Sequence, residues 1–263
     1  MGNNNQSPGY TIEPFSRVRE LVIDVMLPAR KKHNIHILFE ADITDVRNYL
    51  RKQKAETGKS ISLTAYLIKC SADATMTNKR LSARRISARR LVVCDDMHVS
   101  CMVEAEIDGQ SQPLGLIVRQ ANRKGVAEIN GELTGFTEEK KQEQIGRSRL
   151  YSKLPRFIRS RFYRYFTNNP KLIVNHGYNV LVTSVGMFGA GGGHVIPYTD
   201  ASLCIGVGGI TRKPGIVEER IEPREFLAIT VTYDHNITDG APAARFAQEL
   251  KELVECGHGL FDN

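Results

Sequence analysis

The sequence of 263 residues lacks several features that mark particular classes of protein. No apolar run approaches the roughly 20 residues that cross a bilayer. The N-terminus has no basic region followed by an apolar core, which a secretory signal requires. The five cysteines include no Cys-x-x-Cys pair and lie mostly in apolar or alternating stretches. We therefore expect a cytoplasmic protein with buried thiols, and neither a disulfide framework nor a metal site.

Acidic residues are absent between Glu143 and Asp200, and the whole chain carries a net charge of +7. The basic residues gather in two clusters, at 79–90 and 147–171, which would favour an anionic partner. In residues 147–166 leucine and phenylalanine interleave with arginine, which is compatible with a membrane-surface helix or a lid. Packing of the apolar side against the core is the interpretation that we favour. A membrane is therefore not an expected partner. Nucleic acid is not expected either, because no recognised nucleic-acid-binding module is present.

A phosphate-binding loop is also missing. The glycine run from Gly189 to Gly193 matches neither Gly-x-Gly-x-x-Gly nor a Walker pattern, and no Lys-Ser or Lys-Thr follows it. We expect a flexible loop here, with His194 exposed to solvent.

Hydrophobic periodicity predicts an α/β protein of one domain, because 263 residues with 41% apolar content can form an ample single core. Pro28 should bend or interrupt the first helix. The expected helices span residues 15–26, 45–54, 63–74, 125–144 and 242–254, and the expected strands span 35–43, 99–107, 114–119, 179–185, 203–207 and 226–233.

The stretch from Phe226 to Phe246 predicts a strand, a polar corner and a helix. His235 would end the strand, and Asp239 would cap the helix whose first turn contains Pro242. A histidine held between two rigid elements is positioned for proton transfer. On spacing alone, however, such a histidine is more often structural and such an aspartate is more often only a cap.

His-Asn-Ile-Thr-Asp-Gly at 235–240 resembles the His-x-x-x-Asp-Gly signature of the catalytic domain of 2-oxo acid dehydrogenase acyltransferases, which chloramphenicol acetyltransferase shares. Residues 14–19 resemble the opening helix of this family, and residues 182–189 with 205–210 resemble its central strand-loop-strand. The resemblance implies a chloramphenicol acetyltransferase-like α/β fold, in which a two-layer mixed sheet is flanked by helices. It also implies trimers with active sites at the subunit boundary.

The domain organisation that follows is a disordered tail at residues 1–14 and a single catalytic domain at 15–263. We expect no lipoyl domain and no peripheral subunit-binding domain. A lipoyl group would then have to be supplied by another protein.

The resemblance also implies roles for individual residues. His235 would be the general base, and Thr183 would donate a hydrogen bond to the oxyanion, with Ser184 as substitute if the register differs by one residue. Ser184 and Gly186 would border the substrate channel. Asn236 departs from the arginine that pyruvate-complex cores usually carry after the histidine.

Asp239 is expected to act structurally, because the family pairs this aspartate with an arginine near the N-terminus. Arg19 fits that position better than Arg17. The pair would hold the histidine corner in shape.

The expected function is acyl transfer between CoA and a lipoyl or small-molecule acceptor, with CoA as co-substrate and without a metal. A homotrimer or higher oligomer is expected, with lipoyl-carrier or dehydrogenase subunits as candidate partners. The alternative is a non-catalytic scaffold or regulatory subunit of an acyltransferase complex.

Overall fold

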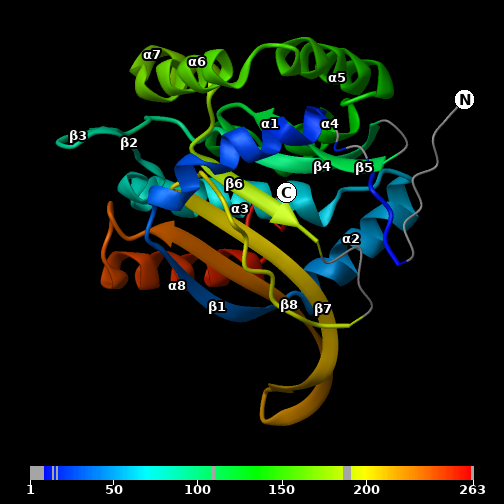
Figure 1. Cartoon of the computed structure of the whole chain (residues 1–263). Helices are drawn as coiled ribbons and strands as arrows, with labels where there is room; N and C mark the ends of the chain where they lie inside the picture. Colours follow the sequence, from blue (N-terminus) through cyan, green and yellow to red (C-terminus); the bar gives the residue numbers. More distant parts are fainter. Residues whose placement is uncertain (1–8, 14, 16, 108–109, 186–190, 262–263) are drawn as a thin grey trace, which may run out of the picture.

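A computed structural model describes residues 9–13, 15, 17–107, 110–185 and 191–261 (Figure 1). The strands are β1 (Asn34–Asp42), β2 (Arg84–Ser87), β3 (Arg90–Val92), β4 (Val99–Ile107), β5 (Gln110–Val118), β6 (Val180–Ser184), β7 (Leu203–Val217) and β8 (Arg220–Asp234). The α-helices are α1 (Arg17–Met26), α2 (Thr44–Thr57), α3 (Leu63–Thr77), α4 (Val126–Thr134), α5 (Glu138–Ser152), α6 (Arg156–Asn168), α7 (Pro170–His176) and α8 (Gly240–Glu255). Short 3-10 turns are η1 (Pro28–Lys31), η2 (Lys79–Ser82) and η3 (Ala121–Arg123).

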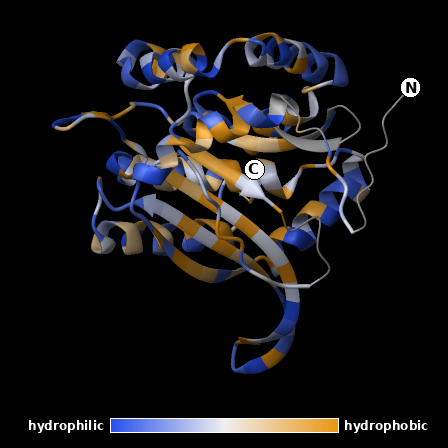
Figure 2. Cartoon of the chain, viewed as in Figure 1, coloured by the Kyte–Doolittle hydropathy of each residue, from blue (hydrophilic) through white to orange (hydrophobic). Residues whose placement is uncertain are grey.

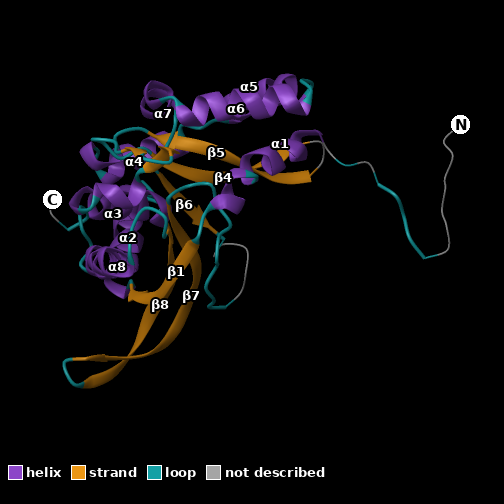
Figure 3. Ribbon diagram, turned by 60° about the vertical axis from the view of Figure 1, so that its left-hand side comes forward, coloured by secondary structure: helices purple, strands orange, loops and turns teal. Residues whose placement is uncertain are grey.

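Six strands form one mixed sheet in the order β1-β8-β7-β6-β4-β5, and β2 pairs with β3 separately. Strands β4, β6 and β7 run parallel, whereas the other neighbours are antiparallel. Helices α2, α3, α4 and α8 cover one face of the sheet (Figure 3). The predicted α/β fold, a mixed sheet with helices layered on it, is therefore confirmed.

The main core lies between the sheet and these helices. Alternation along β1 places Ile37, Phe39 and Ala41 in this core. Tyr66 of α3 is fully buried there, and its hydroxyl donates to the carbonyls of Leu253 (2.8 Å) and Val254 (3.0 Å). These bonds satisfy a buried polar group and tie α3 to the last turn of α8.

Several helix boundaries follow from local sequence signals. Helix α1 ends just before Pro28, as expected. Gly58 ends α2 in the left-handed conformation, with φ at 69°. Ser62 caps α3 by accepting a hydrogen bond from the backbone N–H of Ala65.

The sequence underestimates β7 and β8, which are 15 residues long each and project from the sheet as a hairpin (Figure 1). Pro214 and Gly215 argue against a strand at the sequence level. In the hairpin, Pro214 faces Pro223 directly. The two prolines fit because residues at a non-hydrogen-bonded position point their N–H groups away from the partner strand.

Two other boundaries differ from the prediction. Strand β5 begins at Gln110 rather than Leu114, so the predicted turn is much shorter. The helix expected at 125–144 is two helices, α4 and the start of α5, which separate at the C-cap Gly135. That glycine and Gly131 already weaken a continuous helix in the sequence.

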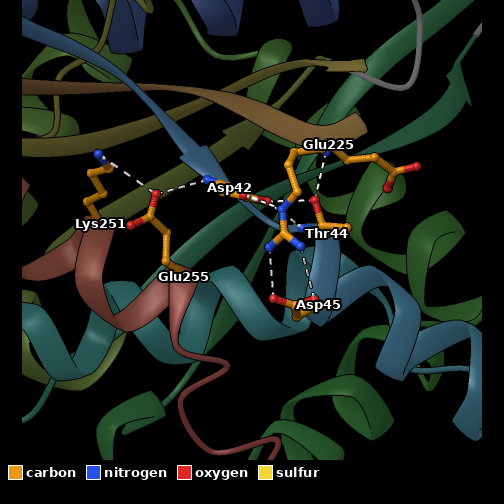
Figure 4. Close-up of polar contacts among 7 residues, drawn as sticks. Asp42, Thr44, Asp45, Glu225, Lys251 and Glu255 are labelled. Atoms are coloured by element: carbon orange, nitrogen blue, oxygen red, sulfur yellow. Dashed lines mark hydrogen bonds and ion pairs between the residues drawn. The ribbon is translucent and has the colours of Figure 1, made fainter. Parts of the chain in front are cut away.

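A polar network fastens the end of β1 to its neighbours (Figure 4). The Asp42 carboxylate accepts hydrogen bonds from Thr44 Oγ1 (2.6 Å) and Arg224 Nε (2.6 Å). Glu255 of α8 accepts a hydrogen bond from the Asp42 backbone N–H at 2.9 Å. Burial opposes the charge on Asp42, but the bonds from Thr44 and Arg224 hold its pKa below the usual value.

Four of the five cysteines are buried, and Cys256 is exposed. No group of side chains within the described ranges could hold a metal ion. Among the helices that the structure describes, none has the length and apolar character needed to cross a membrane.

Helices α5, α6 and α7 form a row at the end of the molecule opposite the β7–β8 hairpin (Figures 1 and 3). The expectation that the apolar side of residues 147–166 faces the core is wrong for α6. Phe157 and Phe162 are 75% and 57% exposed, whereas Arg159 is only 3% exposed. Burial of Arg159 is possible because Asp24 and Glu20 of α1 accept its hydrogen bonds.

Candidate active site

His235 lies at the corner that follows β8. Its backbone N–H donates to the carbonyl of His33 at 2.9 Å, which continues the pairing of β8 with β1 by one residue. Its side chain is exposed, and its ring stacks on that of Tyr233 with the centroids 6.3 Å apart. The strand end therefore fixes the backbone of His235 while its imidazole faces solvent.

Asn236 holds this corner in place. Its Oδ1 accepts a hydrogen bond from His33 Nδ1 at 2.8 Å, and its Nδ2 donates to Asp234 Oδ1 at 2.8 Å. The Asp234 carboxylate is buried and also accepts from the Asn236 backbone N–H at 3.0 Å. The amide side chain thus cross-links the start of β1 and the end of β8. An arginine at this position could not accept the hydrogen bond from His33, because a guanidinium group has only donors.

A buried polar cluster centred on Asp200 lies behind the corner. The Asp200 carboxylate accepts hydrogen bonds from Arg84 Nη2 (2.8 Å), Tyr163 Oη (2.7 Å) and Tyr178 Oη (2.7 Å). Burial disfavours the charged carboxylate, but Arg84 and the two tyrosines hold the pKa of Asp200 below its usual value. The sequence prediction missed this cluster and assigned Arg84 to a basic surface.

Lys32 connects the cluster to the corner. Its Nζ donates to Ser202 Oγ at 3.3 Å, and the Ser202 carbonyl accepts from the Asp234 backbone N–H at 3.0 Å. Burial and the nearby Arg84 lower the pKa of Lys32 to about 8, against the opposing influence of Asp200 and Asp234. Nothing in the local sequence marks this lysine, because its environment comes from residues about 170 positions away.

Asp239 is the N-cap residue of α8, as predicted, but its side chain makes no capping hydrogen bond and is exposed. The expected partner Arg19 is also exposed on α1. Among the ion pairs of the described residues, none joins Arg19 to Asp239. The structure of the single chain does not bring these two predicted residues together.

Thr183 and Ser184 are the last two residues of β6 and are half-buried. Thr183 lies opposite Gly206 of β7, and Gly206 lies opposite Thr230 of β8. The predicted channel residue Gly186 lies outside the described residues.

The sheet register separates Thr183 from His235 within one chain. Thr230 and Thr183 share a row two strands apart, and His235 follows Thr230 by five residues. With about 3.3 Å per residue and about 4.8 Å between strands, the Cα atoms of the two residues are expected roughly 20 Å apart. Acid-base chemistry requires contact within roughly 3 Å. The two residues cannot act together in one protomer.

The glycine-rich loop packs tightly against the sheet where it is described. A bulge in β7 between Val207 and Ile210 lets Gly209 donate its N–H to the carbonyl of Gly193 at 3.0 Å. A side chain at Gly208 would meet the same carbonyl at 2.0 Å, so the close approach requires glycine. His194 is exposed, as expected, with its Nε2 3.1 Å from the carbonyl of Phe39.

A hollow of about 410 Å³ lies elsewhere, lined by the loop between β3 and β4, by the two residues that follow β5 and by α7. Its lining includes His98, Arg119 and Asp96. His98 has a lowered pKa, because it is partly buried and Arg119 is close by. Neither His235 nor Thr183 lines this hollow.

The family model of the 2-oxoacid dehydrogenases acyltransferase (catalytic domain) matches residues 7–151 and 174–261. The chain belongs to this acyltransferase family. The match leaves out residues 152–173, which include the whole of α6.

The 2-oxoacid dehydrogenase acyltransferase relatives include the dihydrolipoyllysine-residue succinyltransferase component of the 2-oxoglutarate dehydrogenase complex of Staphylococcus epidermidis. It is 24% identical over 261 residues, which cover 96% of this chain and 55% of the relative. The chain thus spans about half the length of this curated relative.

Solved structures of low sequence identity share the fold. One is the cubic core of a pyruvate dehydrogenase multienzyme complex, with a TM-score of 0.72, 17% identity and coverage of 99% of this chain and 97% of that one. Another is the dihydrolipoamide acetyltransferase of Azotobacter vinelandii, with a TM-score of 0.71, 16% identity and coverage of 95% and 93%. In the latter protein a serine, a histidine and an asparagine four positions after the histidine were investigated for catalytic roles.

Proposed function

We propose that this chain is a CoA-dependent acyltransferase that exchanges an acyl group between CoA and a second thiol. The observation that carries the proposal is the geometry of the corner, in which a hydrogen-bonded framework holds His235 with its ring facing solvent. His235 and Asp239 are four residues apart, the spacing of the investigated histidine and asparagine in the Azotobacter protein.

In the proposed reaction His235 takes the proton of the attacking thiol, and the thiolate adds to the thioester carbonyl. The hydroxyl of Thr183 from a neighbouring protomer donates a hydrogen bond to the oxyanion that forms. The intermediate then collapses and expels the second sulfur, which recovers the proton from the imidazolium. Imidazole suits both steps because its pKa lies near neutrality.

The boundary site requires an oligomer, and we propose a trimer or a larger assembly of trimers. Exposed apolar side chains on β1 and in the segment before β7 support this proposal. Ile35 and Leu38 on the edge strand β1 are 39% and 46% exposed, and Ile196 and Tyr198 are 58% and 57% exposed. Contact between copies would cover these residues and bring Thr183 of one copy toward His235 of another.

Asp239 is proposed to stabilise the corner rather than to react. Its carboxylate lies at the N-terminus of α8, where a negative charge is favoured by about 0.3–1 kcal/mol. Its pairing with Arg19 remains a prediction for the assembled protein. Ser184 and Gly186 remain candidates for the wall of the substrate channel.

The proposed acceptor is a dihydrolipoyl group carried by another protein, because the Staphylococcus relative is a dihydrolipoyllysine-residue succinyltransferase. Acetyl-CoA and succinyl-CoA should each be incubated with dihydrolipoamide, and free CoA should be separated from acyl-CoA by chromatography. His235→Ala should lower the rate by roughly 10² to 10⁴. His176→Ala, at an exposed histidine of α7, is the matched control and should keep the wild-type rate.

A scaffold without catalytic activity is the alternative, and it is favoured by the missing contact between Arg19 and Asp239 in the single chain. It predicts equal background rates for wild type and His235→Ala with every acyl-CoA and acceptor. That result would refute the proposed enzyme.

A further inference from the structure

The outer side of α6, together with the end of α5 and the connection between the two helices, combines exposed apolar side chains with exposed cations. The apolar members are Leu150, Leu154, Phe157, Ile158, Phe162 and Tyr165, which are 70%, 40%, 75%, 40%, 57% and 62% exposed. The basic members are Lys153, Arg156, Arg161 and Arg164, which are all exposed. These ten residues form what we term the α6 surface, and Figure 2 shows hydrophobic and hydrophilic bands alternating along α5 and α6.

The α6 surface is held rigidly by its inner side. Arg159 Nε donates to Asp24 at 2.8 Å, and Arg159 Nη2 donates to Glu20 at 3.1 Å. Tyr163 donates to Asp200 at 2.7 Å. The polar side of this helix therefore faces the protein, and the aromatic side faces outward.

The charges of the α6 surface have one sign. No acidic residue occurs between Glu143 and Asp200. Within the described residues, no ion pair involves Lys153, Arg161 or Arg164. Arg156 forms an ion pair with Asp24, with 3.4 Å between Nε and Oδ1. A second copy presenting this same surface would oppose cation to cation, so isologous self-association is disfavoured.

Residues 152–173 lie outside the part of the chain that matches the family model, and α6 falls entirely within them. The fold shared with the family therefore does not require this helix. It also lies at the end of the molecule opposite the β7–β8 hairpin (Figures 1 and 3).

We propose that the α6 surface docks this protein on an anionic lipid bilayer. Phenylalanine, tyrosine and leucine enter the interface between headgroups and acyl chains, and arginine and lysine bind the lipid phosphates. The arginine stems lie along the apolar boundary while their guanidinium groups stay among the headgroups.

Vesicle flotation with the full-length protein tests the proposal. The vesicles are phosphatidylcholine alone or phosphatidylcholine with phosphatidylglycerol at about three to one, at low salt. Wild type should float with the anionic vesicles and stay at the bottom with the neutral ones. Raising the salt concentration should reduce flotation, because screening weakens the attraction.

Two double variants separate the apolar from the electrostatic contribution. Phe157→Ser with Phe162→Ser should lower the partition coefficient by about tenfold or more. Arg161→Gln with Arg164→Gln should lower it by about 25-fold, since each cation near an anionic surface contributes about fivefold. Both pairs of side chains are exposed, so unchanged circular dichroism and melting should accompany the loss of binding.

Matched controls are available on the β7–β8 hairpin. Ile216→Ser with Ile221→Ser changes residues that are 81% and 78% exposed, and Arg212→Gln with Arg220→Gln gives the same net charge as the α6 variant. Both control variants should float like wild type.

Several results would overturn the proposal. One is failure of wild type to float with anionic vesicles. Another is flotation of the α6 variants equal to that of wild type. A third is a loss of flotation in the hairpin controls equal to the loss in the α6 variants. If the phenylalanine variant still floats like wild type, electrostatic attraction alone accounts for binding. That result would reject docking through the aromatic side chains. Dissociation of the oligomer by the α6 variants, with no flotation of wild type, would assign the surface to contact between copies.

Discussion

Two inactive variants of this protein should restore activity to each other when their protomers mix. His235→Ala removes the proposed base, and Thr183→Ala removes the proposed oxyanion donor, which should lower the rate by about 10² to 10³. The sheet register places the two residues roughly 20 Å apart in one chain. If both residues take part in the proposed reaction, the site combines His235 of one protomer with Thr183 of the next.

The expected recovery follows from counting boundaries. In a random equal mixture, half of the protomers carry an intact histidine and the other half carry an intact threonine. About a quarter of the boundaries then join one intact residue to the other, so the mixture should reach about a quarter of the wild-type rate.

A mixture of wild type with the doubly substituted chain is the control. It should give about a quarter of the wild-type rate for a site between protomers, but about half for a site within one chain. The protomers should carry two different affinity tags and be refolded together, so that mixed assemblies can be purified before CoA release is measured. Absence of recovery in purified mixed assemblies would refute the boundary site.

Three further predictions concern the packing behind the site, and urea denaturation measures each of them. Asp200→Asn removes the buried charge that pairs with the partly buried Arg84 and should cost roughly 3–5 kcal/mol of unfolding free energy. Glu143→Gln in an exposed pair should cost less than about 1 kcal/mol. Equal costs would show that the Asp200 pair is not effectively buried. Lys32 has a folded pKa of about 8 against an ordinary 10.5, so the unfolded state binds more protons between these values. The unfolding free energy of wild type relative to Lys32→Met should consequently rise from pH 8 toward pH 10, and a flat difference would contradict the buried environment. Gly208→Ala would place its side chain 2.0 Å from a backbone carbonyl of the glycine-rich loop and should cost about 1–3 kcal/mol, and a neutral effect would mean that the loop moves away without cost.

The six strands of the main sheet were predicted in their correct order because local patterns determine them, whereas β2, β3, α6 and α7 were not among the predicted elements. Alternation identified β1 and the end of β8, and α2 ends at Gly58, a residue type that readily adopts the left-handed conformation. The corner carrying His235 was predictable for the same reason, since strand, turn and helix signals follow one another within 21 residues of sequence. The extension of β7 through Pro214 and Gly215 was not predicted, because the effect of these residues on a strand depends on which N–H groups the partner strand needs.

The amino-acid sequence alone determined which residues are basic, apolar or hydroxylated, and it placed His235 and Asp239 at the two ends of one corner. Only the tertiary structure decided which arginines are buried. Arg84 meets Asp200 across 116 positions and Arg159 meets Asp24 across 135, so no local pattern records either pair. Burial of Arg159 turned the aromatic side of α6 outward, because burial of a charge depends on partners that the fold brings from distant parts of the chain. The register of β6, β7 and β8 separated Thr183 from His235, and this pairing too joins segments far apart in the sequence.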